Sequence, residues 1–221
     1  NTLIVFLSDN GACDEDIPNL AKSKKIEDMG SEKSFESYKK SWANFSNTPY
    51  RFYKKSEYEG GIRTPFILLW PKKIQTSGIV HQVAHINDLM PTFLDIANLE
   101  YPEVFNGDSI IPFQGKSLLP ILEGGDTFKR EPLFWEHEAC RAVRSGDWKL
   151  VSFAGDEPGY KGEWELYNLA EDPTETINLA HKYPGKVDEL EEEWDKWAGN
   201  NKVYPLNGMG WNERIKMAES N

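Results

Sequence analysis

The sequence has few cysteines, no long apolar run and little positive charge. Its 221 residues include only two cysteines, Cys13 and Cys140, whose spacing is that of neither a disulfide framework nor a zinc cluster. No apolar stretch approaches the length needed to span a bilayer. The formal net charge of −11 argues against nucleic acid or an anionic membrane as the main partner, because a polyanion needs a basic face to bind.

The sequence also lacks the charged, apolar and small-residue regions of a signal peptide. It begins almost directly in an apolar run, and we therefore expect a fragment whose upstream part, targeting signal included, is missing. The apolar content of 39% and the aromatic content of 13% are enough for a real core in one large domain or two small ones.

The first half of the chain has an α/β rhythm. The apolar run from Leu3 to Leu7 predicts a strand buried on both faces of a parallel sheet, and residues 66–70 predict a second buried strand. Asp88 can cap a helix with apolar residues at helical spacing. The polar stretch 14–46 between these elements is a long excursion, either a wall of a substrate pocket or a disordered flap.

From about Arg130 the pattern changes. Three apolar runs with Gly- and Asp-containing turns predict a small antiparallel sheet, and an amphipathic helix follows. The predicted strands are 133–138, 141–153 and 163–169, and the predicted helix is 184–198. The predicted domains are 1–129, an α/β portion; 130–200, a small α+β subdomain; and 201–221, a tail.

Three residues of the first half offer site chemistry. Asp9 and Asn10 follow the first strand and supply the oxygen donors that a hard cation such as Ca²⁺ requires, although Asp-Asn-Gly is also ordinary turn chemistry. Lys54 precedes Gly60-Gly61, a turn at which the backbone could approach a bound anion. Its ammonium could bind an oxyanion as a point charge, and Lys55 could take the same part.

In order and spacing, five blocks of the sequence resemble the second half of the sulfatase family, in the alkaline-phosphatase superfamily. They are Leu-Ser-Asp-Asn-Gly at 7–11, Lys54 with Glu-Gly-Gly-Ile-Arg-Thr-Pro at 59–65, His-Ile-Asn-Asp-Leu-Met-Pro-Thr at 85–92, Gly-Lys-Ser-Leu-Leu-Pro at 115–120, and Leu-Ala-Glu-Asp-Pro-Thr-Glu-Thr-Ile-Asn-Leu-Ala at 169–180. The fold implied is part of an alkaline-phosphatase-like mixed α/β sheet with flanking helices, followed by a small C-terminal antiparallel sheet packed with a helix.

The resemblance implies a hydrolase of sulfate esters, acting on a sulfated small molecule or carbohydrate. It makes Asp9 and Asn10 calcium ligands and Lys54 the lysine that binds the sulfate group. The family's nucleophile is a formylglycine made in a Cys/Ser-x-Pro/Ala-x-Arg motif, which this sequence lacks. We therefore expect the missing N-terminal portion to supply the nucleophile, the isolated chain to be inactive, and calcium to bind only in the full-length parent. A periplasmic or extracellular location is also implied.

His137 and Arg141 are candidates for substrate binding. His137 could donate a proton to the substrate, and Arg141 could bind an acidic group or a sugar. A structural role for either residue stays open. In family members that this region resembles, the small sheet closes one side of the pocket, which favours substrate contact.

Several other polar residues are expected to be structural. His85 anchors the start of a helix, Arg63 pairs with Glu59, and Asp172 and Glu175 belong to a turn that fixes the last helix.

Two alternatives to a sulfatase stay open. One is a phosphodiesterase or phosphonate hydrolase of the same superfamily, which can share the Asp-Asn pair. The other is a non-catalytic binding domain, which the presence of Asp9, Asn10 and Lys54 together disfavours.

Overall fold

The computed structural model describes residues 1–15, 22–35, 39–75, 77–154, 162–204 and 206. The chain divides into two compact units, one of residues 1–6 with 66–131 and one of residues 7–65 with 132–221. The sequence assigned residues 7–65 to the α/β portion, whereas here they pack with the C-terminal part of the chain. The domain division of the parent protein stays a prediction, and most of the predicted tail lies outside the described residues.

The C-terminal unit is built on a four-stranded antiparallel sheet in the order β5-β6-β7-β8. Its strands are β5 (Leu133–His137), β6 (Cys140–Ser145), β7 (Trp148–Ser152) and β8 (Trp164–Asn168). The predicted antiparallel sheet is confirmed, but the single run predicted over 141–153 is two strands. The chain reverses between Ser145 and Trp148, where Gly146 adopts a φ of 61° that suits a two-residue hairpin loop.

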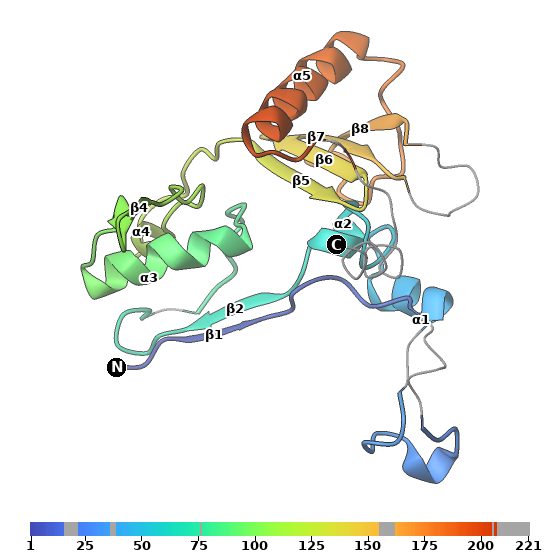
Figure 1. The fold of residues 1–221 in the computed structure, drawn as a ribbon, viewed down its shortest axis with the longest axis horizontal. Coiled ribbons are helices and arrows are strands. Elements are labelled where there is room, and N and C mark those ends of the chain that lie inside the picture. Colours follow the sequence, from blue (N-terminus) through green and yellow to red (C-terminus); the bar gives the residue numbers. More distant parts are fainter. Residues whose placement is uncertain (16–21, 36–38, 76, 155–161, 205, 207–221) are drawn as a thin grey trace. The chain divides into compact units, whose positions relative to one another are not determined.

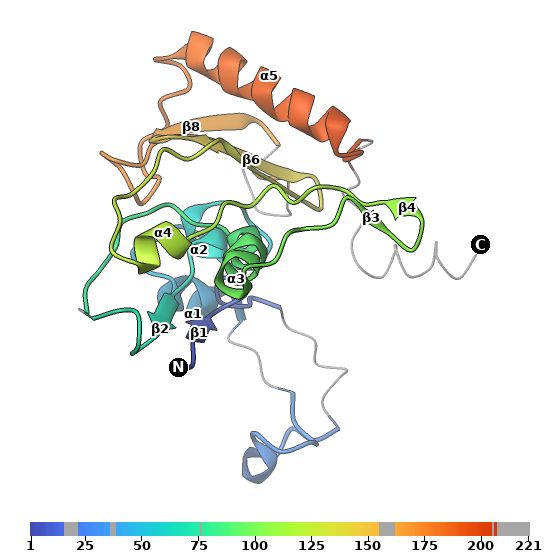
Figure 2. The same ribbon diagram turned by 90° about the vertical axis from the view of Figure 1, so that its left-hand side faces the viewer.

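This sheet is a layer with a different neighbour on each face. Helix α5 (Pro184–Asn200) covers one face, where Leu190 and Trp194 pack against β6, β7 and β8, and α2 (Glu59–Ile62) lies on the opposite side (Figures 1 and 2). The predicted final helix is thus confirmed. On the second face Tyr58 packs against Ala142 and Val151. The sheet therefore supports the segment that carries Lys54.

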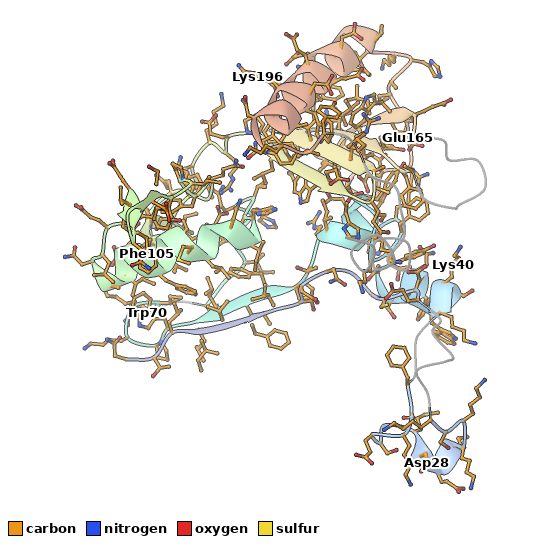
Figure 3. All side chains as sticks on the ribbon, viewed as in Figure 1. Asp28, Lys40, Trp70, Phe105, Glu165 and Lys196 are labelled. Carbon is orange, nitrogen blue, oxygen red and sulfur yellow. The ribbon has the colours of Figure 1, made fainter. Side chains whose placement is uncertain are left out.

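The predicted polar excursion contains elements that its sequence did not indicate. The short 3-10 helix η2 (Ile26–Asp28) and helix α1 (Lys39–Ser46) form within it, whereas residues 16–21 and 36–38 lie outside the described residues. Figure 3 shows the side chains of α1, with Lys40 labelled. Trp42 and Phe45 of α1 are both 64% exposed and meet edge to face, with ring centroids 5.6 Å apart.

The part of the other unit that the structure describes holds two short two-stranded sheets and three short helices. Strand β1 (Ile4–Leu7) pairs with β2 (Phe66–Leu69) in a two-stranded sheet, and β3 (Val104–Phe105) pairs with β4 (Asp108–Ser109). The other elements are η3 (Ile86–Asp88), α3 (Leu89–Ala97) and α4 (Leu119–Leu122). Among the described residues, no helix combines the length and the apolar character needed to cross a membrane.

The prediction that the first two strands are buried on both faces is wrong for this chain. Phe6 of β1 is 62% exposed and Ile67 of β2 is 58% exposed. Two strands alone form a narrow ribbon that cannot bury both of its faces. The apolar composition of these strands was read correctly, but their burial requires neighbours on both sides of the ribbon.

A buried ion pair holds the start of α3. The fully buried carboxylate of Asp88 accepts hydrogen bonds from both Nη atoms of Arg130, each 2.7 Å away, and from the backbone N–H groups of His85 and Lys116. The Nδ1 atom of His85 accepts a 3.3 Å hydrogen bond from the N–H of Asn87. His85 therefore anchors a helix start as predicted, while the carboxylate of Asp88 binds η3 and Arg130 and caps no N–H of α3.

We predict that Arg130→Met destabilises the protein by about 3–5 kcal/mol, because it leaves the Asp88 carboxylate buried without its charged partner. Lys73→Met is the matched control: Lys73 pairs with Glu123 at 2.9 Å, but both side chains are 46% exposed. Its loss is expected to cost at most about 1 kcal/mol. Urea denaturation of both variants measures the difference, and equal losses would contradict the role given to Asp88.

Candidate functional site

The segment that follows β1 packs directly on the double glycine of α2. The N–H of Gly11 donates a 2.8 Å hydrogen bond to the carbonyl of Gly61. A Cβ at Gly11 would lie 1.9 Å from the carbonyl oxygen of Gly60, and a Cβ at Gly61 would lie 2.0 Å from that of Ser56. The close approach that the sequence predicted for an anion is here an approach between backbone segments, and the predicted turn is a short helix.

Lys54 lies beside the end of β1. Its backbone N–H donates to the carbonyl of Ala12 at 3.0 Å, two residues beyond Asn10. The side chain of Asn47 bridges the same two segments: its Oδ1 accepts from the N–H of Ala12 at 3.1 Å, and its Nδ2 donates to the carbonyl of Phe52 at 3.0 Å. The structure thus brings the backbone of Lys54 next to the segment that carries Asp9 and Asn10.

A carboxylate that the sequence did not single out joins the two candidate lysines. Oε2 of Glu15 lies 3.2 Å from Nζ of Lys54, and Oε1 of Glu15 lies 2.9 Å from Nζ of Lys55. The thiol of Cys13 also donates to Oε2, at 3.3 Å. The hydrogen bond from Lys55 is the main cause that lowers the pKa of Glu15 to about 2. Nothing in the acidic stretch 14–16 distinguishes this residue, because the pairing depends on the fold.

His137 lies on a hairpin whose tip interacts with this cluster of charges. His137 ends β5 and is exposed, and Glu138 and Ala139 form the turn with φ values of 51° and 68°. Burial alone would lower the pKa of Lys55, but the hydrogen bond and charge of Glu15, together with the charge of Glu138, raise it. The hairpin tip therefore lies within electrostatic range of Lys55. Substrate contact by His137 stays a prediction.

Arg141 lies on the face of the sheet that α5 covers. Its guanidinium carbon is 4.2 Å from the ring centroid of Trp164 and 5.3 Å from that of Trp194, on the side that α5 covers. One Nη atom donates to the carbonyl of Gly162 at 3.3 Å. These contacts match the structural alternative that the sequence left open, and they do not bring Arg141 to Lys54. Substrate binding by Arg141 stays a prediction.

Asp9 and Asn10 offer a carboxylate and an amide oxygen at the strand end. Asp9 is exposed and Asn10 is partly exposed. The described residues contain no group of three or more His, Cys, Asp and Glu side chains that could hold a metal ion. Oxygen donors suit Ca²⁺, but the ion takes about six to eight of them. The pair therefore fits part of a calcium site, whose other ligands must come from elsewhere, and calcium stays a prediction.

A second missed feature is a buried ion network beneath the site. Nζ of Lys149 has no exposed surface and lies 2.8 Å from a carboxylate oxygen of Glu59 and 2.8 Å from one of Glu175. Arg63 also lies near Glu59, at 3.7 Å, as predicted. The sequence offered one indication of this network. Lys149 stands at an inward-facing position of an apolar strand, and a buried lysine requires a carboxylate partner.

We predict that Gly61→Ala destabilises the protein by about 2 kcal/mol or more, since the new methyl group would overlap backbone carbonyls that cannot move independently. Gly199→Ala in α5 is the control, because a Cβ there meets no atom within 4 Å. That change is expected to be neutral or to stabilise by up to about 1 kcal/mol. Chemical denaturation gives both values, and a harmless Gly61→Ala would rule out the close packing of α2 on the carbonyls of Tyr53 and Ser56.

We predict that the Glu15 carboxyl titrates near pH 2 in the folded protein. A folded-state pKa below the unfolded value stabilises the fold above about pH 4.5, and this contribution disappears as the pH falls toward 2. NMR titration of the side-chain carboxyl measures this directly. Lys55→Gln should raise the pKa toward its ordinary value, and Lys196→Gln, an exposed change in α5, should leave it unchanged. An ordinary pKa in the unmodified protein would exclude the paired geometry.

Residues 49–197 match the protein family described as N-sulphoglucosamine sulphohydrolase, C-terminal. An uncharacterized sulfatase of Schizosaccharomyces pombe is 33% identical over 207 residues, which cover 88% of this chain and 37% of the relative. The N-acetylgalactosamine-6-sulfatase of Canis lupus familiaris is 31% identical over 149 residues, which cover 67% of this chain and 23% of the relative. The chain thus spans little more than a third of the first of these proteins and less of the second.

Solved structures of sulfatases share the fold. One from Bacteroides thetaiotaomicron, described in connection with the metabolism of multiple glycosaminoglycans, is 26% identical with a TM-score of 0.60, covering 87% of this chain and 38% of the other. The mixed α/β fold of the alkaline-phosphatase-like sulfatases, which the sequence resemblance implied, is confirmed. On the family match and these relatives, the chain belongs to the family described as N-sulphoglucosamine sulphohydrolase, C-terminal, and so to the sulfatases.

Proposed function

We propose that this chain is the C-terminal portion of an enzyme that hydrolyses sulfate esters, with Lys54 in its sulfate-binding site. The observation that carries the proposal is the backbone contact that seats Lys54 beside the strand end bearing Asp9 and Asn10. Membership of the sulfatase family supports this chemistry over that of a phosphodiesterase or phosphonate hydrolase. An anion site also accounts for two lysines gathered at one place in a chain with a net charge of −11.

Lys54 would bind an oxygen of the sulfate group and stabilise the charge that develops on the leaving oxygen. An ammonium held in place before the reaction needs no reorganisation when that charge develops. Glu15 accepts the hydrogen bond of Lys54 at 3.2 Å in this structure. Sulfate oxygens would replace one carboxylate oxygen of Glu15, while Lys55 keeps the other.

Asp9 and Asn10 would supply two of the oxygen ligands of a calcium ion, with the remaining ligands and the formylglycine nucleophile coming from the rest of the parent protein. A calcium ion, when bound, would neutralise negative charge on the sulfate oxygens. The cation requires a carboxylate ligand, and the chain provides Asp9 just beyond the end of β1. These residues alone would not complete the active site.

The substrate class we propose is a sulfated carbohydrate. One relative is named for a sulfated N-acetylgalactosamine, and the Bacteroides sulfatase is described in connection with glycosaminoglycans. His137, exposed on the hairpin tip near Lys55, would contact the sugar at the edge of the site. A periplasmic or extracellular location accords with such a substrate.

Lys54→Ala in the full-length parent should lower kcat by about two to three powers of ten, the usual effect of removing one preorganised charge partner. Lys196→Ala, which removes an exposed lysine of α5, should leave kcat unchanged. Turnover of a sulfated sugar and of a small aryl sulfate by both variants is the measurement. Unchanged turnover in Lys54→Ala would remove this residue from the site and withdraw the proposal.

A further inference from the structure

Both ends of the segment that carries Lys54 bind to a single residue of the C-terminal part. Upstream of Lys54, Nη1 of Arg51 donates a 2.9 Å hydrogen bond to the backbone carbonyl of Glu175. Downstream, the backbone N–H of Glu59 donates a 2.6 Å hydrogen bond to Oε2 of the same residue. Glu175 and Glu59 are buried. Residues 51–59 thus form a loop whose two ends share one anchor.

The ion network fixes the orientation of this anchor. Nζ of Lys149 lies 2.8 Å from Oε1 of Glu175 and 2.8 Å from Oε1 of Glu59, with no exposed surface on Lys149. Burial alone would lower the pKa of Lys149, but the two carboxylates raise it, so the ammonium keeps its charge. Both oxygens of Glu175 are therefore engaged, one with Lys149 and one with the N–H of Glu59.

The backbone at Glu175 is held in a conformation that glutamate rarely adopts. Its φ is 57°, in the left-handed region, and such outliers persist only where the surroundings hold them in place. The preceding Asp172 supplies part of that support, since its Oδ2 accepts hydrogen bonds from the N–H groups of Thr176 and Ile177 at 2.7 and 2.8 Å. The turn therefore holds Glu175 in contact with the segment that carries Lys54.

The loop itself has little regular structure to hold its shape. Phe52 and Lys55 both adopt left-handed backbone conformations, with φ values of 63° and 77°. Between its ends, the loop is held by two hydrogen bonds, from the N–H of Lys54 to the carbonyl of Ala12 and from Nδ2 of Asn47 to the carbonyl of Phe52. The placement of the Lys54 ammonium therefore depends on these two contacts and on where the two ends are anchored.

We infer that Glu175 is a positioning residue for Lys54: it holds both ends of the loop 51–59 and so sets the position of the sulfate-binding ammonium. This inference rests on the proposed function, because it assigns Glu175 to the same site. Glu175 touches no substrate in this account and acts through Lys54. It also links the C-terminal sheet to the reaction, because Lys149 of β7 holds Glu175 in place.

The experiment compares Glu175→Gln with Arg130→Met in the full-length parent. Glutamine keeps the size of the side chain and an oxygen for the N–H of Glu59 but loses the ion pair with Lys149. Arg130→Met breaks a buried ion pair in the other unit. Both variants lose stability, so kcat is measured per folded molecule well below their unfolding transitions. We expect kcat to fall about 10- to 100-fold in Glu175→Gln, the scale of an ångström-sized misplacement, and to stay within about 2-fold in Arg130→Met.

A readout independent of activity is limited trypsin digestion of the native proteins. Cleavage after Lys54 or Lys55 should accelerate in Glu175→Gln and not in Arg130→Met, because only the former weakens an anchor of the loop. Glu175→Asp, which keeps the charge on a shorter side chain, should fall between wild type and Glu175→Gln in both readouts, and it serves as the test if the glutamine variant does not fold.

The outcomes separate this inference from the function on which it rests. If Lys54→Ala keeps full turnover, the proposed function fails. If Lys54→Ala loses turnover while the Glu175 variants keep both kcat and the wild-type cleavage rate, Glu175 serves stability alone and the inference is overturned.

Discussion

The C-terminal unit depends on one buried ammonium shared by two carboxylates. Lys149 lies on the inner strand β7 of the four-stranded sheet, and its ammonium pairs with the carboxylates of both Glu59 and Glu175. A buried charge is tolerated only when it is paired and hydrogen-bonded, and removing either carboxylate would leave an unbalanced group in the core. The ion network therefore fixes three stretches of chain that are far apart in sequence: the Lys54 loop, strand β7 and the turn before α5.

Around this network the packing explains how a small sheet supports the segment that carries Lys54. One face of the sheet is covered by α5 through Leu190 and Trp194, and the other supports Tyr58 and the loop that contains Lys54. The double glycine of α2 lets that loop pack against the helix, and Gly11 lets the strand end of Asp9 and Asn10 pack on α2 in turn. The sheet thus acts as a platform, and the residues proposed for chemistry stand on segments that it supports.

Local pattern predicted much of this fold. The antiparallel sheet and α5 follow from alternating and helical apolar spacing, and His85 followed from its place before a helix. The hairpin between β6 and β7 was missed although Gly146 and Asp147 mark it, because a two-residue loop leaves only a short polar break between the strands. The burial of β1 and β2 was wrong because it depends on neighbours, which no spacing within a strand reveals. Helix α1 was missed because it is only eight residues long and its apolar residues are just Trp42, Ala43 and Phe45, too few to establish a helical period.

For the site, the sequence singled out Lys54, Asp9 and Asn10 and the structure brings their segments together, but it could not anticipate the partners. Glu15 lies 39 residues from Lys54 along the chain and Glu175 lies 116 residues from Glu59, so both contacts arise only from folding. Arg141 drew attention through its charge, yet strand alternation places it on the helix-covered face between Trp164 and Trp194. Strand alternation sets its side, but only the sheet packing identifies that side as the one facing α5.

The central claim is that Lys54 and the Asp9-Asn10 pair serve one sulfate-binding site. A crystal structure of the full-length parent with a sulfated sugar and calcium tests it most directly. The account predicts the Nζ atom of Lys54 at about 3 Å from a sulfate oxygen, with the oxygens of Asp9 and Asn10 on the metal that contacts the same group. A sulfate bound elsewhere, with Lys54 still paired to Glu15, would contradict it.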